Sequence, residues 1–350
     1  MPLGLGLGIT KLKSLVSGLR VRFQGNATIT AALDGILREL SADFVSNGTV
    51  TAALEAIKLL DVDFSGDGTL TADIASFTGL LDDYPNAAAA YSVRLLKSDY
   101  TGALVRIRKD TGGQPEKDFY PDENGELSLN SSDGGTTLGS WIGSNSGYVV
   151  TWYSQAGVSG RDATQSTAAN QPQILSGGAL ITKNGKVALD FDGVNDEMSA
   201  ATANSSLNSA NSYSLSLVAS INNNNSFETA FESENSGGIQ LLIDTRTQSR
   251  HTILNGTNPV FWNMAARNNS TNLRLNTAFH DSGDMSVFSN GTAGTSSSYT
   301  GSYGNSIFRI GKAGGANYDG YISEFILWSQ NEISNRTGIE TNINDYFSIY

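Results

Sequence analysis

Three short stretches near the N-terminus alternate between apolar and polar residues, at positions 19–23, 40–44 and 60–64. A segment rich in Gly, Asn, Asp or Ser follows each stretch, and a Thr-rich apolar run comes next, at positions 28–33, 49–54 and 69–74. Alternation with a period of two places the apolar side chains on one face of a β-strand. The residues between the strands tolerate the left-handed backbone of tight turns. The pattern therefore predicts three β-hairpins, one in each copy of a repeat.

The repeat is regular, because Phe23, Phe44 and Phe64 fall 21 and then 20 residues apart. A repeated unit usually cannot bury its apolar face alone, and an isolated hairpin is marginally stable in water. We therefore expect this region to attach the molecule to a partner or to associate with other chains. The apolar residues that would make those contacts are Leu19, Val21, Phe23, Leu40, Phe44, Leu60 and Phe64.

The connectors at 34–40 and 55–60 allow a second interpretation of the repeat. Apolar residues between positions 29 and 40 also recur at the spacing of one face of a helix. Each copy could therefore combine a strand with a short helix instead of forming a hairpin.

The sequence does not predict a metal site. Residues 61–67 resemble the opening of an EF-hand calcium loop, but the twelfth position, which needs a bidentate Glu, is Ala72. Only two histidines occur, His251 and His280, so a catalytic site with three histidine ligands is impossible. We expect a structural role for each histidine, and neither a metal nor a cofactor.

Residues 82–90 interrupt the repetition and contain one of the six prolines of the chain. We place the domain boundary there. The resulting division is an N-terminal arm at 1–18, the repeat at 19–81, a linker at 82–90 and a second domain at 91–350.

The second domain has the pattern of an all-β protein. Short β-rich runs separated by Gly, Asn and Ser clusters occur at 180–182, 186–191, 213–219, 239–243, 307–310 and 322–328. Many such runs without long amphipathic helices between them indicate a sandwich or a barrel. Near the end of the chain, Ile339, Ile343, Tyr346 and Phe347 fall on one face of a helix, which we expect to close the sandwich.

Composition supports this fold class and narrows the partners. The chain of 350 residues has 38 glycines and only 16% charged residues, as expected of an all-β protein with many turns. Its net charge of −12 argues against nucleic acid and anionic membranes as partners, and no apolar run is long enough to span a bilayer. The absence of cysteine excludes disulfides and suits synthesis in a reducing cytoplasm.

Several runs between residues 90 and 198 resemble a known family. The most specific are Val-Val-Thr-Trp-Tyr-Ser-Gln at 149–155 and Gly-Arg-Asp-Ala-Thr-Gln at 160–165, with supporting runs at 90–96, 100–108 and 118–125. They are similar to the catalytic domain of the fungal and bacterial arabinofuranosidase B family, and to bacteriophage structural proteins that carry this domain without catalysis. Runs at 191–196, 307–311 and 318–328 resemble concanavalin A-like and laminin G-like sandwiches. The resemblance implies a jelly-roll sandwich of two antiparallel sheets.

The same resemblance implies that the catalytic residues of the family are missing. Asp244 is retained beside the family's nucleophilic glutamate, but that glutamate corresponds to Arg246 in this chain. The family's general acid follows an Ile-Gly pair, after which this chain has Lys312 and Ala313. Because a glycosidase needs two carboxylates beside the scissile bond, we expect no catalysis. An enzyme would have to draw its carboxylates from the remaining candidates, Asp244, Asp319 and Glu232.

Without catalysis, the resemblance implies carbohydrate binding through aromatic rings. An aromatic ring offers an apolar plane with a polar edge, and loops commonly carry binding residues. The aromatic residues that fall in Asn-, Ser- and Gly-rich segments are Trp262, Tyr299, Tyr303 and Tyr318. By contrast, Trp152 and Trp328 lie in alternating strands, and we expect both in the core.

Taken together, the repeat and the resemblance predict a structural protein of a bacteriophage virion, either a fibre or a decoration subunit. We expect a homo-oligomer, as a trimer, that contacts other virion proteins and displays a glycan-binding jelly roll on the virion surface. Two alternatives stay open: a glycoside hydrolase of the arabinofuranosidase type and a bacterial surface adhesin.

Overall fold

The computed structural model divides the chain into two compact units, Met1–Thr78 and Gly79–Tyr350, which we call the repeat unit and the sandwich unit. The structure describes residues 7–10, 19–23, 27–44, 48–64, 69–74, 77–200, 212–222, 227–233, 239–244, 248–255, 258–263, 272–281, 283–295, 297–298, 308–313 and 316–350. The backbone alone is described within 7–74, 227–229, 233–263 and 297–298 and at 313.

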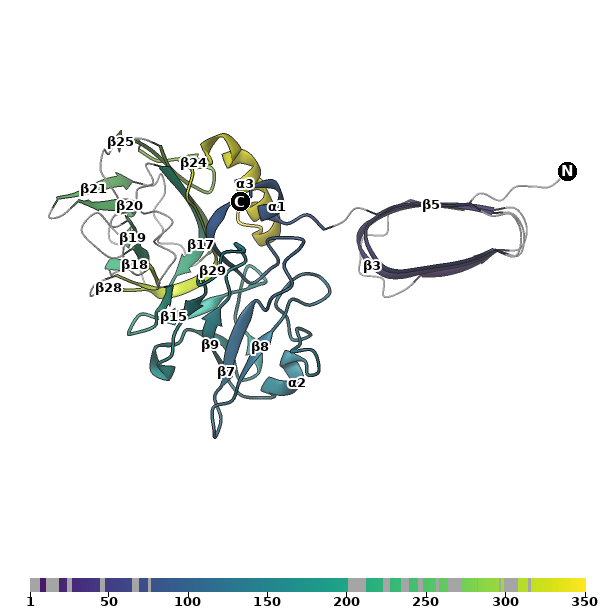
Figure 1. Ribbon diagram of the computed structural model, residues 1–350, viewed down its shortest axis with the longest axis horizontal. Coiled ribbons are helices and arrows are strands. Elements are labelled where there is room, and N and C mark those ends of the chain that lie inside the picture. Colours follow the sequence, from purple (N-terminus) through teal and green to yellow (C-terminus); the bar gives the residue numbers. More distant parts are fainter. Residues whose placement is uncertain are drawn as a thin grey trace. The chain divides into compact units, whose positions relative to one another are not determined.

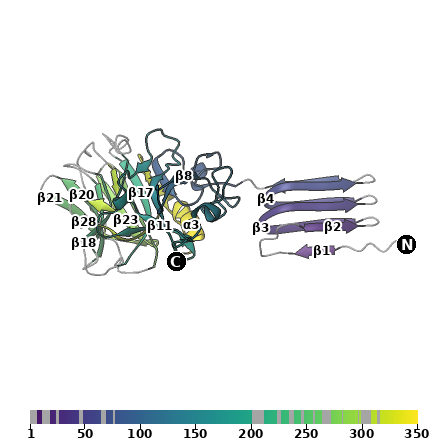
Figure 2. The same ribbon diagram turned by 90° about the horizontal axis from the view of Figure 1, so that it is seen from below.

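The described strands of the repeat unit are β1 (Leu7–Thr10), β2 (Leu19–Phe23), β3 (Ala27–Phe44), β4 (Gly48–Phe64) and β5 (Thr69–Ile74). They pair in parallel throughout, β1 and β2 with β3, β3 with β4, and β4 with β5. Figure 2 shows these strands stacked side by side, and β3 follows a curved path in Figure 1. The prediction of three hairpins is therefore wrong, because a hairpin pairs its two strands antiparallel.

The register of this sheet matches the sequence repeat. Phe23 pairs with Phe44, and Phe44 pairs with Phe64. The offset between paired residues of β3 and β4 is 21 up to Leu33 and 20 from Ile36 onward, so an irregularity between them absorbs the extra residue. Each segment thus bonds to its equivalent in the next copy, rather than to its own neighbour along the chain.

The alternative with a short helix is also wrong. The connectors at 34–40 and 55–60 lie inside β3 and β4, where the parallel ladder continues across most of their length. In this ladder, the backbone hydrogen bonds of one copy are made by the next copy, and a helical turn would interrupt them. The seven residues that we expect to mediate attachment all lie in β2, β3 and β4, but their side chains are outside the described part. Their burial against other chains stays a prediction.

The sandwich unit confirms the all-β prediction. Its longer strands are β6 (Ala87–Ser92), β7 (Val105–Lys109), β8 (Glu116–Phe119), β9 (Gly147–Trp152), β11 (Gln173–Ser176), β15 (Leu189–Asp192), β16 (Met198–Ala200), β17 (Ser212–Ile221), β18 (Phe227–Ser233), β19 (Ile239–Asp244), β20 (Gln248–Asn255), β21 (Asn258–Asn263), β22 (Arg274–Asp281), β23 (Asp284–Ser289), β26 (Phe308–Ile310) and β29 (Asp319–Trp328). Two-residue strands are β10 (Ala163–Thr164), β12 (Ala179–Leu180), β13 (Thr182–Lys183), β14 (Lys186–Val187), β24 (Thr292–Ala293), β25 (Ser297–Ser298), β27 (Lys312–Ala313) and β28 (Ala316–Asn317). The helices are α1 (Leu80–Asp83), α2 (Leu138–Ile142) and α3 (Arg336–Phe347), with 3-10 turns at Ala168–Asn170 and Ile333–Asn335.

The described strands of this unit pair antiparallel in one continuous network, apart from two separate pairs, β13 with β14 and β27 with β28. One layer runs β23, β22, β17 and β29, and β29 continues to β6 along one half and to β15 along the other. From β15 the network passes through β11 to β9 and β7. The other layer runs β10, β16, β26, β18, β19, β20 and β21, and β10 joins it to β9.

Aromatic side chains fill the core between the layers. Phe231 lies 4.6 Å from Phe308 and 4.8 Å from Phe325 between ring centroids, and Tyr91 lies 5.8 Å from Trp152. All five are completely buried. Burial of a large aromatic side chain contributes a few kcal/mol, so this cluster is a main source of stability. The expected core position of Trp152 is confirmed.

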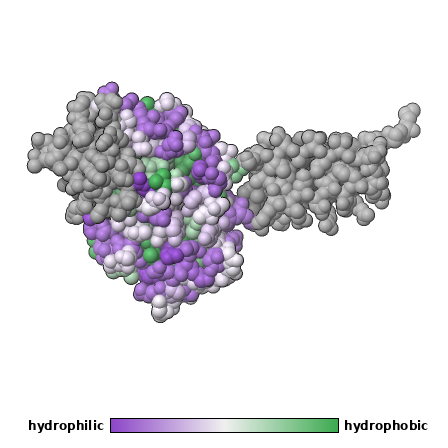
Figure 3. Space-filling view, viewed as in Figure 1, coloured by the Kyte–Doolittle hydropathy of each residue, from purple (hydrophilic) through white to green (hydrophobic). Residues whose placement is uncertain are grey.

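A second apolar cluster lies between the sheet and helix α3. It contains Trp328, confirming its predicted burial, together with Ile339, Ile343 and Phe347 from the helix. The helix that we predicted at the C-terminus therefore closes one face of the sandwich, as Figure 1 also shows. Among the described residues, no helix is long and apolar enough to cross a membrane. On the face of the sandwich unit that Figure 3 colours, the surface is mostly hydrophilic, with apolar residues only in small groups.

A buried ion pair fastens this helix to the sheet. Arg94 Nε lies 2.9 Å from Glu324 Oε2, and Glu324 is completely buried. Ser92 Oγ donates to the same carboxylate oxygen at 2.7 Å, and Arg94 Nη1 donates to Asn342 Oδ1 of α3 at 3.0 Å. Arg94 thus bonds both to a strand and to the helix that covers it.

The expected linker at 82–90 belongs to the sandwich unit. Leu80 and Leu81 of α1 are buried in the second cluster, and β6 pairs with β29. The turn between α1 and β6 is short and contains Pro85. The apolar residues on both sides of it are buried in the second cluster. The boundary between the units falls between residues 78 and 79.

Candidate functional site

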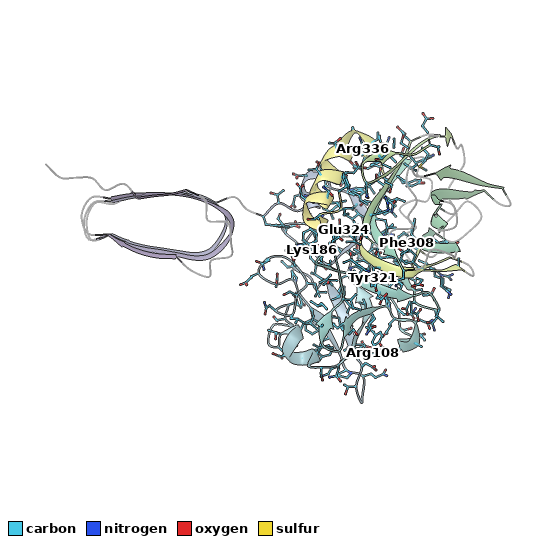
Figure 4. The ribbon with its side chains drawn as sticks, turned by 180° about the vertical axis from the view of Figure 1, so that it is seen from behind. Arg108, Lys186, Phe308, Tyr321, Glu324 and Arg336 are labelled. Atoms are coloured by element: carbon cyan, nitrogen blue, oxygen red, sulfur yellow. The ribbon has the colours of Figure 1, made fainter. Side chains whose placement is uncertain are left out.

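A row of polar and aromatic residues crosses five neighbouring strands of the sandwich. The backbone register places in this row Arg108 of β7, Tyr148 of β9, Gln173 of β11, Asp190 of β15 and Tyr321 of β29. The residues next to them along the strands, including Ile107, Val149, Ile174 and Leu189, are completely buried. Because side chains alternate along a strand, the row lies on the outer face of the sheet. Arg108 and Tyr321 are labelled in Figure 4.

A pocket of about 530 Å³ lies over part of this row. Its lining includes Arg108, Tyr148, Gln171, Asp190, Asp192 and Asp196. The 3-10 turn at Ala168–Asn170 supplies two small residues to its wall. The pocket therefore combines one aromatic ring, one guanidinium, amide groups and several carboxyl groups.

Arg108 is held on several sides. Its Nε donates to Gln171 Oε1 at 2.6 Å, and its Nη2 donates to the carbonyl oxygen of Ala168 at 3.1 Å. The guanidinium carbon lies 4.6 Å from the centre of the Tyr148 ring, a cation–π contact. A looser ion pair joins its Nη1 to Asp110 Oδ1 at 3.7 Å. Arg108 thereby fixes one face of the Tyr148 ring and one wall of the pocket.

A tight turn after β15 holds the carboxyl groups of Asp192, the last residue of that strand, and Asp196 close together. Asp192 Oδ1 accepts the amide hydrogens of Val194 at 2.8 Å and Asn195 at 3.1 Å, and Asp196 Oδ2 accepts the amide hydrogen of Asp192 at 3.0 Å. Gly193 has a φ of 73°, and a Cβ there would lie 2.7 Å from the Cβ of Asp319. Only glycine fits this turn, which brings Asp196 back beside the strand end.

Two of these carboxyl groups are protonated more readily than usual. Burial raises the pKa of Asp196 to about 7, and the charges of Asp192 and Asp190 add to this effect. Burial also raises the pKa of Asp190 to about 6, with further contributions from Asp319 and Asp192. A buried carboxylate beside like charges is costly to ionise, and strongly perturbed groups gather at functional sites.

The pocket suits a small polar ligand with an apolar face. Tyr148 offers part of an aromatic ring, while Gln173, Asp190 and Asp196 can accept or donate hydrogen bonds to hydroxyl groups. Within the described part of the chain, no three acidic or histidine side chains are grouped to hold a metal ion.

The expected binding residue Tyr318 lies in the core, not on a rim. It is completely buried, its hydroxyl donates to the carbonyl oxygen of Ser220 at 2.9 Å, and its ring packs against Phe191. The aromatic prediction is therefore wrong for Tyr318, because the following strand begins at once and turns the ring inward. Trp262 lies in β21, and its side chain is outside the described part, as are Tyr299 and Tyr303 altogether.

The three alternative catalytic carboxylates lie in three different strands, β29, β18 and β19. Asp319 begins β29 and pairs with Asp192, close to the pocket, where its charge raises the pKa of Asp190. Glu232 is buried in β18 opposite Arg309. Asp244 ends β19, and its side chain is outside the described part.

Two further residues singled out in the sequence have structural surroundings. Lys312, which with Ala313 occupies the position expected for a general acid, extends its Nζ to 3.7 Å from Glu197 Oε1. His280 is buried and stacks on Tyr213, with ring centroids 5.4 Å apart. The position of Arg246 lies outside the described residues.

The sequence interpretation missed the pocket residues. Their signal was available in part, since Tyr148, Gln173 and Asp190 each occupy an outward position in an alternating strand. Alternation alone does not indicate which strands are neighbours, so the row could not be assembled from it.

No protein-family model matches the chain, and no curated protein matches it. Solved structures of arabinofuranosidases share its fold. An arabinofuranosidase in complex with arabinofuranosyl-alpha-1,2-xylobiose has a TM-score of 0.57 and 14% identity, covering 73% of this chain and 62% of that one. A GH54 α-L-arabinofuranosidase soaked with a cyclic sulfate inhibitor has a TM-score of 0.55 at the same identity and coverage. The chain spans less than two thirds of those enzymes, and the likeness establishes the glycoside hydrolase-type β-sandwich fold alone.

Proposed function

We propose that the sandwich unit binds carbohydrate without cleaving it, and that the repeat unit mounts it on the surface of a bacteriophage virion. The pocket carries the binding proposal. A volume of about 530 Å³ falls within the range of small-molecule sites, and its lining mixes an aromatic ring with polar side chains, as a saccharide requires. The arabinofuranosidase-type fold supports the same class of ligand by analogy.

The proposed lack of catalysis follows from the residues at the family's catalytic positions. Lys312 and Ala313 occupy the place expected for the general acid, and Lys312 Nζ lies 3.7 Å from Glu197 Oε1. Arg246 takes the place expected for the nucleophile. Neither side chain can perform the carboxyl chemistry of a glycosidase.

The proposed attachment role is supported by the parallel stack of the repeat unit. Among the described strands, β5 pairs only with β4, which leaves one of its edges for a further strand. We propose that the partners are further copies of this chain, as a homotrimer, and other virion proteins. The glycans would be those of the host surface, and the chain would reach the virion after synthesis in the host cytoplasm.

Isothermal titration against a panel of plant and bacterial cell-wall oligosaccharides tests the binding proposal. We expect Tyr148→Ala to weaken binding of the best ligand at least tenfold, because the ring supplies the apolar surface. Tyr120→Ala removes another exposed ring, outside the pocket lining, and is the matched control. Melting temperatures of both variants verify folding. Absence of binding to every saccharide, or equal loss in both variants, would overturn the proposal.

Sedimentation velocity tests the attachment proposal. We expect the full chain to sediment as a trimer and residues 77–350 as a monomer. A monomeric full chain would contradict a role for the repeat unit in assembly.

A glycoside hydrolase is the second candidate, favoured by one observation. The pKa of Asp196, raised to about 7 by burial, is that of a carboxyl group able to donate a proton near neutral pH. Release of nitrophenol from an aryl arabinofuranoside, abolished by Asp196→Asn, would establish this alternative.

A further inference from the structure

The charges that line the pocket are unbalanced. Among the described residues of its lining, Arg108 is the single basic one, whereas Asp110, Asp190, Asp192 and Asp196 contribute carboxyl groups. A saccharide that carries carboxylate or sulfate groups would meet repulsion in this setting, and a cationic one would meet attraction.

Arg108 is poorly placed to receive an anion from a ligand. Its Nε and Nη2 donate to Gln171 and Ala168, and the Tyr148 ring covers one face of the guanidinium. The guanidinium is therefore used within the protein, where it orients the ring and Gln171.

Asp190 and Asp196 accept hydrogen bonds, but neither has a cationic partner among the residues that the structure describes. Among the described residues, neither forms an ion pair within 4.0 Å of a Lys, Arg or His nitrogen. The charge of Lys183 lowers the pKa of Asp190 somewhat, and its Nζ lies over the Tyr321 ring at 4.0 Å. The other charged groups that act on the pair, Asp192 and Asp319, are acidic. Both residues line the pocket; Asp190 is partly exposed and Asp196 lies buried behind it in the wall, so a ligand cation would meet Asp190 first.

We propose that the pocket selects saccharides that carry an unsubstituted amino group, whose ammonium pairs with Asp190 and Asp196. This inference rests on the proposed carbohydrate-binding function and names its ligand class. An ammonium stabilises the ionised form of two carboxyl groups that have no ion-pair partner among the described residues. It also displaces the protons held there, because the pKa values of Asp190 and Asp196, raised to about 6 and about 7, fall when a cation binds.

The test compares three trisaccharides by isothermal titration at pH 6: tri-glucosamine, tri-N-acetylglucosamine and tri-galacturonate. We expect tri-glucosamine to bind at least tenfold more tightly than its acetylated analogue, and tri-galacturonate most weakly. Titration in two buffers of different ionisation enthalpy should show release of protons on binding of tri-glucosamine. The Asp190→Asn/Asp196→Asn double variant should abolish both the preference and the proton release, while keeping its affinity for the neutral trisaccharide.

A matched variant separates this selectivity from general attraction of a cation to an acidic protein. Asp99→Asn/Asp345→Asn replaces the same number of carboxyl groups at exposed positions outside the pocket lining, and we expect the preference to persist. Equal affinity for the amino and acetylated sugars overturns the inference and leaves the proposed function standing. A preference lost equally in both double variants also overturns it. Failure of any saccharide to bind overturns the proposed function itself.

Discussion

Replacement of Asp196 by asparagine should change how the stability of the sandwich unit depends on pH. The folded protein raises the pKa of this carboxyl from its ordinary value of 3.8 to about 7. Between these values the folded state holds a proton that the unfolded state has released. Stability from this group is therefore present at low pH and is lost as pH rises from about 4 through about 7.

The magnitude follows from the two pKa values. A group with a folded pKa of about 7 and an unfolded pKa of 3.8 is almost fully protonated at pH 5 in the folded state and ionised at pH 8 in both states. Integrated over this range, Asp196 lowers the free energy of unfolding by about 2.5 kcal/mol from pH 5 to pH 8. The asparagine that replaces Asp196 cannot titrate, but its amide oxygen can still accept the amide hydrogen of Asp192, so the turn after β15 is kept.

Urea denaturation at pH 5, 6.5 and 8 measures the effect on residues 77–350. We expect the pH-dependent loss to be smaller in Asp196→Asn by about 2.5 kcal/mol, with the variant more stable than the wild type at pH 8. Asp99→Asn removes an exposed carboxyl and is the control. Parallel curves for the wild type and Asp196→Asn would refute the reasoning, since they would mean that burial does not hold a proton on this group.

Two further predictions concern the architecture. Arg94→Met should lower the free energy of unfolding by about 3–5 kcal/mol, because it leaves the Glu324 carboxylate buried without its partner. Adding Glu324→Leu should restore much of that loss in urea denaturation. If the two substitutions instead lowered stability additively, the ion pair would not be the cause. Deletion of residues 1–76 should leave the melting temperature of the sandwich unit unchanged in calorimetry. Deletion of residues 1–84 should lower it markedly, because it removes the buried Leu80 and Leu81 of α1. Equal melting temperatures for the two truncations would place the boundary elsewhere.

The fold of the sandwich unit was largely predictable from local pattern. Short β-rich runs between Gly, Asn and Ser clusters identified several of its strands, and the spacing of Ile339, Ile343 and Phe347 identified the helix that covers one face. The repeat unit was not predictable in the same way. A hairpin and a parallel stack of repeat copies show the same alternation and the same turn residues. These patterns do not specify whether a strand pairs with its neighbour along the chain or with the equivalent strand of the next copy. The matched register of Phe23, Phe44 and Phe64 shows that the repeat period itself carried that information.

The candidate site was harder to anticipate than the fold. Tyr318 was chosen because it lies in a polar, glycine-rich segment, yet its ring is completely buried. Arg108, Tyr148 and Asp190 are far apart in sequence and come together only through strand order. A sequence pattern reports the face of a strand on which a residue lies, whereas a site depends on which faces become neighbours.

Because the strands of the repeat unit pair in register, the length of this unit depends on the number of repeat copies. Each copy of 20 or 21 residues bonds only to the copies before and after it. Duplication or loss of one internal copy would therefore lengthen or shorten the stack by one strand spacing, about 4.8 Å, without altering the other pairings. Related chains could therefore differ in the length of the repeat unit, by whole copies, while the sandwich unit stays the same.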